Sequence, residues 1–221
     1  MELTQAIMER KSIRGYLDKP VEKETLEKVL KLSQRAVSAL NTQPWKFAVV
    51  TGDVLKKIAA ENIACVEQEA EPDYLDPETK GVYRERRVGV AIQLFKAMDI
   101  AREDRPKRNW WGQRGFRFFD APAAILIYMD GELDETKNRF EMGTVTQLIT
   151  LAAMEYGLGT CVENQAIMYQ KGLREYLDLP ETARFAAGVA IGYPDPDFPA
   201  NSVVSERADL ADVTTWYGFD E

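Results

Sequence analysis

The residues best suited to chemistry lie near the N-terminus, where three cations and a hydroxyl fall within five positions. These residues are Arg10, Lys11, Ser12 and Arg14, in a chain of 221 residues with a formal net charge of -8. Arginine binds phosphate oxygens through two parallel N–H groups, and serine adds another donor. A small cationic cluster in an acidic chain therefore predicts a phosphate pocket. A solvated basic helix end is the alternative, since cations also complement the negative end of a helix dipole.

A second polar segment, residues 38–45, offers hydroxyl and amide groups from Ser38, Asn41 and Gln43. Pro44 keeps the residue before it out of the helical region, which favours a turn. Trp45 is expected to pack in the core where a strand begins. Together the two segments predict one cofactor site built from two parts of the chain.

The chain contains no histidine, which removes several kinds of chemistry. Neither a Ser-His-Asp nor a Cys-His arrangement can form, and no metal can be held by histidine. Two cysteines, Cys65 and Cys161, are too few for a disulfide framework or a zinc site. We therefore expect no metal and no catalytic side chain, and a bound cofactor that carries the chemistry.

The acidic balance argues against general nucleic-acid binding, which requires a basic face. No apolar run reaches the roughly 18–20 residues of a membrane span, and the first residues lack the pattern of a signal peptide. These features predict a cytoplasmic protein with neither a nucleic-acid nor a membrane partner.

Apolar periodicity indicates the elements that must position these residues. Helical spacing occurs over residues 2–10, 20–37, 52–65, 83–103, 136–156 and 173–177. Apolar runs typical of strands occur over residues 45–51, 123–129, 160–162 and 186–191. An acidic loop is expected over 67–83. Strands among longer helices, without regular alternation, predict an α+β fold.

Five motifs, in order from residue 10 to residue 207, together resemble the signatures of the FMN-dependent nitroreductase family. The motifs are Arg10–Arg14, Ser38–Trp45, Ala121–Tyr128, Gly157–Cys161, and Gly192–Pro194 with Ser205–Arg207. The resemblance implies a single domain over 1–221, with a variable excursion and lid within 67–120. It also implies a central, mostly antiparallel sheet flanked by helices, and an interlocked homodimer that exchanges its C-terminal segments.

The resemblance also assigns roles to residues. Arg10, Lys11, Ser12 and Arg14 would bind FMN together with Ser205 and Arg207. Ser38, Asn41 and Gln43 would reach the flavin of the partner subunit, although Val37 stands where the family usually has proline. Val162, Glu163 and Asn164 would face flavin N5, where a charged Glu163 would disfavour the reduced ring unless it points away.

The segment around Trp110, Trp111, Arg114 and Phe118 lies where the family varies. Its aromatic rings could form a lid that stacks on a planar acceptor, with an arginine receiving an anionic group. A satellite hydrophobic cluster is the alternative.

The resemblance thus implies an enzyme that transfers hydride from NAD(P)H through FMN to a nitroaromatic or quinone. Reductive dehalogenation and other flavin redox reactions occur on the same scaffold. A flavin-binding protein without turnover is the alternative from another class.

Overall fold

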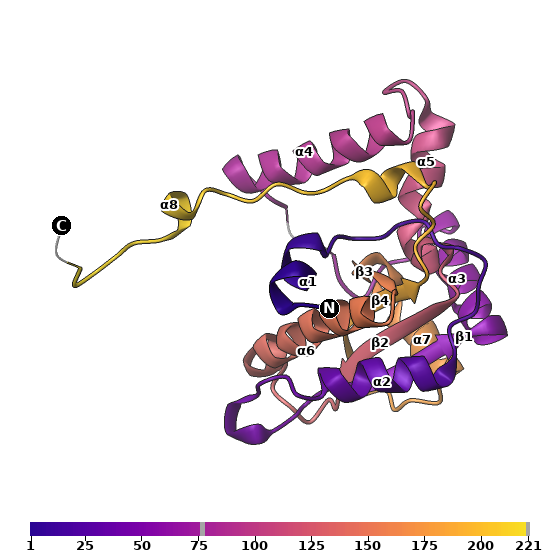
Figure 1. Ribbon diagram of the computed structural model, residues 1–221. Helices are drawn as coiled ribbons and strands as arrows, with labels where there is room; N and C mark the ends of the chain where they lie inside the picture. The colour runs from indigo at the N-terminus through magenta and orange to yellow at the C-terminus, as the bar shows by residue number, and fades with distance from the viewer. Residues whose placement is uncertain (76–77, 220–221) are drawn as a thin grey trace.

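The computed structural model describes residues 1–75 and 78–219, and a four-stranded sheet lies at its centre (Figure 1). The strands are β1 (Lys46–Thr51), β2 (Ala123–Met129), β3 (Gly159–Glu163) and β4 (Arg184–Gly192), in the order β1-β2-β4-β3. Every neighbouring pair is antiparallel. Helices flank this sheet, which confirms the predicted α+β class. Residues 76–77, which belong to the acidic loop expected over 67–83, and residues 220–221, at the end of the expected domain, lie outside the described residues.

Helices cover both faces of the sheet. The longer ones are α2 (Lys23–Ser33), α3 (Gly52–Glu67), α4 (Gly81–Ala97) and α6 (Glu135–Glu155). The shorter ones are α1 (Leu3–Glu9), α5 (Arg105–Gln113), α7 (Gln170–Tyr176) and α8 (Leu210–Val213). Short 3₁₀ segments are η1 (Ala39–Asn41), η2 (Gly115–Asp120), η3 (Gln165–Ile167) and η4 (Pro199–Ser202). None of the described helices is long and apolar enough to cross a membrane.

Alternating side chains of the sheet feed two separate cores. Ile125 and Ile127 pack with α2 and α6 on one face. Ala124 and Leu126 pack with α3, α7 and η2 on the other. Because both faces are covered, β2 reads as an almost continuous apolar run rather than an alternating one.

The end of α6 brings the chain into β3. Gly157, at φ +68°, donates to Met154 O, and Leu158 donates to Ala153 O, as in a Schellman cap. The left-handed residue suits glycine because it has no Cβ. Two residues later the chain enters the edge of the sheet.

Several boundaries differ from the sequence prediction. The helix expected over 20–37 is α2, which ends at Ser33. The helix expected over 83–103 is α4, which ends at Ala97. There Asp99 adopts φ 50° and Ile100 N donates to Phe95 O, so the chain turns and buries Ile100 beside Trp111. The aromatic segment that follows forms α5 and η2.

The C-terminal tail leaves the body of the protein. Figure 1 shows it passing along α4 and projecting beyond the other elements. Its large apolar side chains are 62–84% exposed: Val204, Leu210, Val213, Trp216, Tyr217 and Phe219. The tail therefore buries little apolar surface in a single chain.

Candidate functional site

The cationic segment lies against the free edge of β3. Ile13 N donates to Thr160 O at 2.9 Å, and Ser12 forms a parallel bridge with Thr160. Gly159 permits this approach, because a Cβ there would lie 2.5 Å from Ile13 Cγ1. The structure therefore brings together two of the predicted parts of the site, residues 10–14 and 162–164.

The edge of β3 offers backbone groups beside this segment. In an antiparallel ladder, residues two apart direct their N–H and C=O to the same side. Thr160 O faces Ile13, so the backbone of Val162 also points away from β4. Among the described residues it has no partner on that edge. A donor and an acceptor thus stand next to the cations.

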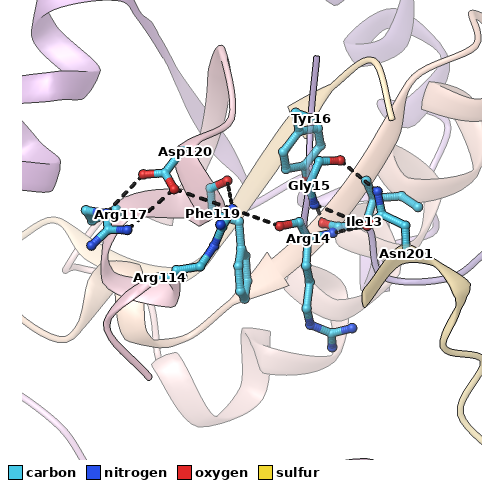
Figure 2. Close-up of polar contacts among 9 residues, drawn as sticks. All are labelled: Ile13, Arg14, Gly15, Tyr16, Arg114, Arg117, Phe119, Asp120 and Asn201. Carbon is cyan, nitrogen blue, oxygen red and sulfur yellow. Dashed lines mark hydrogen bonds and ion pairs between the residues drawn. The ribbon is translucent and has the colours of Figure 1, made fainter. Parts of the chain in front are cut away.

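Asn201 holds the main chain of the cationic segment. Its Oδ1 accepts from Arg14 N at 2.7 Å and from Gly15 N at 3.1 Å, and its Nδ2 donates to Gly15 O at 2.8 Å. The side chain is only 6% exposed. Figure 2 shows Asn201 beside this stretch of backbone. Sequence reasoning missed this residue, which is 187 positions from Arg14 and belongs to none of the motifs.

Arg114 supports the same segment from the other side. Its Nη2 donates to Arg14 O at 3.0 Å and to Phe119 O at 2.9 Å, and it lies 3.4 Å from Asp120 Oδ2 (Figure 2). Burial lowers the pKa of Arg114, while Asp120 opposes that shift. The expectation that Arg114 receives an anionic acceptor is therefore corrected, since its guanidinium is a buried structural support.

The lid prediction also needs correction for the aromatic rings. Phe118 has no exposed surface and belongs to the core between α3 and the sheet. Trp111 is 9% exposed and packs with Leu94 and Ile100. These two rings are packing residues in this chain. Trp110 is 42% exposed, so its ring could still meet a ligand.

The guanidinium of Arg14 points away from Arg114 in Figure 2. The Arg14 side chain is half-buried, and its Nη1 donates a long hydrogen bond of 3.5 Å to Ser12 O. Arg10, Lys11 and Ser12 are also half-buried. Their main chain is fixed while cationic donors stay within reach of solvent, which suits a phosphate.

Beneath the β3 edge lies a cluster of buried ionisable groups. Burial raises the pKa of Glu163 to about 8, against the opposing effects of the Cys161 thiol and of Arg14. Burial also raises the pKa of Cys161 and of Tyr16 well above their usual values. Glu163 is thus mostly neutral at pH 7, and its carboxyl lies under the main chain of Gly115. A neutral carboxyl removes the repulsion that a charged Glu163 would exert on a reduced flavin.

The other predicted contacts lie elsewhere in this single chain. Ser38, Asn41 and Gln43 belong to the loop after α2, which Figure 1 places apart from the segment leading out of α1. Arg207 lies on the tail, where it donates to Ser205 Oγ at 2.8 Å and to Glu206 O at 3.0 Å. Asn164 is exposed at the end of β3. Their flavin contacts stay predictions.

The chain is similar to known proteins over nearly its whole length. The model of the Nitroreductase family matches residues 7–193. A nitrobenzene nitroreductase from Ectopseudomonas oleovorans is 34% identical over 218 residues, covering 95% of this chain and 94% of the relative.

Solved structures are similar over the whole chain. The FMN and NADPH-dependent nitroreductase NfnB from Sphigopyxis sp. strain HMH superposes with a TM-score of 0.92 at 29% identity, covering 99% of this chain and 100% of the other. The FMN-dependent nitroreductase NfnB from Mycobacterium smegmatis, solved in complex with NADPH, gives 0.89 at 26% identity, covering 97% of each chain.

Proposed function

The chain belongs to the nitroreductase family, and from that premise we propose that it is an FMN-dependent oxidoreductase. It takes hydride from NAD(P)H and reduces an electron-poor acceptor such as a nitroaromatic or a quinone. The two solved structures named above support this proposal, since one is described as an FMN and NADPH-dependent nitroreductase and the other as an FMN-dependent nitroreductase in complex with NADPH.

The observation that carries the proposal is the position of the cationic segment on the open edge of β3. Arg10, Ser12 and Arg14 would hold the FMN phosphate and ribityl chain. The unpaired backbone of Val162 would meet the polar edge of the ring. The cationic segment offers donors for the phosphate, and the adjacent edge of β3 offers backbone groups for the planar ring. This set of groups fits FMN.

Bound FMN supplies the redox chemistry, because its ring accepts a hydride and passes it on. The residues of this chain bind and orient. Asn201 and Arg114 fix the backbone that carries the phosphate donors. Tyr16 and Cys161 keep their protons, because burial raises the pKa of both groups. Neither therefore serves as a base at neutral pH, and protons can come from water.

The proposal includes a homodimer in which the loop of Ser38, Asn41 and Gln43 and the tail with Ser205 and Arg207 complete the neighbouring site. In a single chain these groups are exposed or half-buried. Both cysteines are free, which supports a reducing, cytoplasmic location.

The test is whether purified protein carries FMN and turns over. A yellow protein with an absorption band near about 450 nm is expected, together with NAD(P)H oxidation that depends on nitrobenzene or a quinone. Protein that stays colourless after incubation with FMN would overturn the proposal. Bound flavin without turnover would favour a binding protein, and chloride release from a chlorinated aromatic would favour a dehalogenase.

A further inference from the structure

The loop between α2 and β1 holds a strained backbone. Leu40, Asn41 and Gln43 adopt φ values of 52°, 55° and 45°, in the left-handed region that residues with a Cβ rarely occupy. Such conformations persist only where surrounding contacts determine them. The contacts that hold this loop therefore decide where its side chains point.

Two side chains from α6 reach the loop. Glu141 Oε1 accepts from Ala39 N at 3.3 Å. Thr144 Oγ1 lies 3.0 Å from Val37 O and 2.8 Å from Glu141 O, so its one hydrogen is shared between the loop and its own helix. Glu141 and Thr144 are three residues apart, so they share one face of the helix. One helix face thus fixes the loop at its start and at its first turn.

Packing does not explain a glutamate at this position. Glu141 is 5% exposed, and its Oε2 has no partner among the described residues. Burying a carboxylate with one oxygen unsatisfied is unfavourable, and an apolar side chain of similar volume is often at least as stable in such a place. What a glutamate supplies at this position, and an apolar side chain would not, is the acceptor for Ala39 N.

The fixed loop presents two sets of donors. Ser38 Oγ accepts from Gln43 N at 3.1 Å, which leaves its hydroxyl hydrogen to donate outward. Asn41 Oδ1 accepts from Gln43 Nε2 at 3.0 Å, which leaves the Asn41 amide hydrogens. Both residues were predicted from the sequence to contact flavin.

We propose that Glu141, together with Thr144, is a positioning residue that holds the loop of residues 38–43 in the conformation that presents Ser38 and Asn41 to FMN. This inference rests on the proposed function. Without the contacts from Glu141 and Thr144 the loop samples other conformations. FMN affinity then falls in proportion to the fraction of molecules whose loop keeps the binding conformation.

The test compares Glu141→Met, which fills the same space without an acceptor, with Glu141→Gln, whose amide oxygen can still accept from Ala39 N. FMN affinity is measured by quenching of flavin fluorescence, and stability by thermal unfolding of the FMN-free protein. Glu141→Met should weaken FMN binding by about tenfold or more without lowering the unfolding temperature. Glu141→Gln should bind close to the parent.

Thr150→Val is the matched control, since the Thr150 hydroxyl donates to Gln147 O within the same helix and does not reach the loop. Thr144→Val should weaken FMN binding by several-fold, whereas Thr150→Val should not. Parent-like affinity in Glu141→Met would overturn the inference. A loss of affinity matched by a lower unfolding temperature would also overturn it, because the role would then be structural. Failure of the parent itself to bind FMN would instead refute the proposed function.

Discussion

Arg14 combines a fixed backbone with a half-buried guanidinium whose Nη1 lies 3.5 Å from Ser12 O, and this sets it apart from the other arginine of the site. Its N–H and C=O are held by Asn201 and Arg114. Its guanidinium is half-buried and directed away from Arg114. Arg114 has the same charge but is buried and bonded to backbone oxygens. Two arginines that look equivalent in the sequence are thus placed differently: Arg114 supports the fold, and the proposed role of Arg14 is to bind the cofactor.

Replacing Arg14 by Ala removes the guanidinium with its aliphatic stem but leaves both backbone hydrogen bonds available. We expect FMN affinity to fall by roughly 1.5–3 kcal/mol, the range for a charged hydrogen bond. Titration of the FMN-free protein with FMN measures this. Lys56→Ala on α3 is the control, since it changes the net charge equally and lies away from the site. Unchanged affinity in both Arg10→Ala and Arg14→Ala would contradict the phosphate assignment.

Glu163 makes stability depend on pH. Its folded pKa of about 8 lies above the ordinary value of 4.5, so the folded state holds a proton that the unfolded state releases between these values. The contribution is complete below pH 4.5 and is lost as pH rises toward 8, at up to about 1.4 kcal/mol per pH unit. Glu163→Gln cannot ionise and should show a flatter profile. Urea unfolding from pH 5 to pH 9 measures the slope, with the exposed Glu67→Gln as control. Equal slopes in parent and Glu163→Gln would show that the carboxyl does not titrate in this window.

At the scale of elements, the sequence predicted what depends on local periodicity. The strands at 123–129 and 186–191 and the helix at 136–156 lie within one or two residues of β2, β4 and α6. In each of these elements the apolar pattern follows from how many of its faces are covered by neighbouring elements. The bend after Ala97 was missed, because the apolar spacing continues through Ile100, which is buried after the turn.

The site could be predicted only in part. Its donors belong to two short motifs, whereas the residues that fix them come from distant segments. Asn201 bonds to residues 186 and 187 positions away, and no local pattern announces such a pair. Burial was hidden as well, so Arg114 and Phe118 were read as ligand contacts although they support the fold.

At Gly159 the cationic segment and β3 approach each other closely. A Cβ there would lie 2.5 Å from Ile13 Cγ1 and 2.8 Å from Pro194 Cγ. Gly159→Ala should therefore push the cationic segment off β3, lowering stability by about 1–3 kcal/mol as overpacking does and weakening FMN binding. Gly89→Ala is the control, since nothing lies within 4 Å of its position in α4. Denaturant unfolding and FMN titration of both variants measure the effects. If Gly159→Ala has the stability and the FMN affinity of the parent, the close contact between the cationic segment and β3 is not needed for either property.

At the scale of the whole molecule, exposed apolar surface gathers at both ends of the chain. In α1, Leu3, Ile7 and Met8 are 53–76% exposed, and on the tail Trp216 and Tyr217 are 65% and 84% exposed. The Trp216 ring lies edge-on to Phe219, with the two ring centroids 5.4 Å apart. A single chain with this much exposed apolar surface would tend to associate. A symmetric partner offers a closed arrangement in which each copy covers the other.

The tail should therefore hold a dimer together. We expect the full chain to sediment as a dimer of about 50 kDa, twice its 25.1 kDa mass. Deletion of residues 208–221 removes the exposed aromatic residues but keeps Arg207, and it should shift the equilibrium toward monomer. Sedimentation velocity over a range of protein concentrations measures this shift. Val54→Ser, which removes an exposed apolar side chain from α3 instead, is the control. A full chain that sediments as monomer when loaded with FMN would refute the dimer. A truncated chain that remains fully dimeric would assign the interface to α1 and α6 rather than to the tail, because these elements would then bury enough apolar surface on their own.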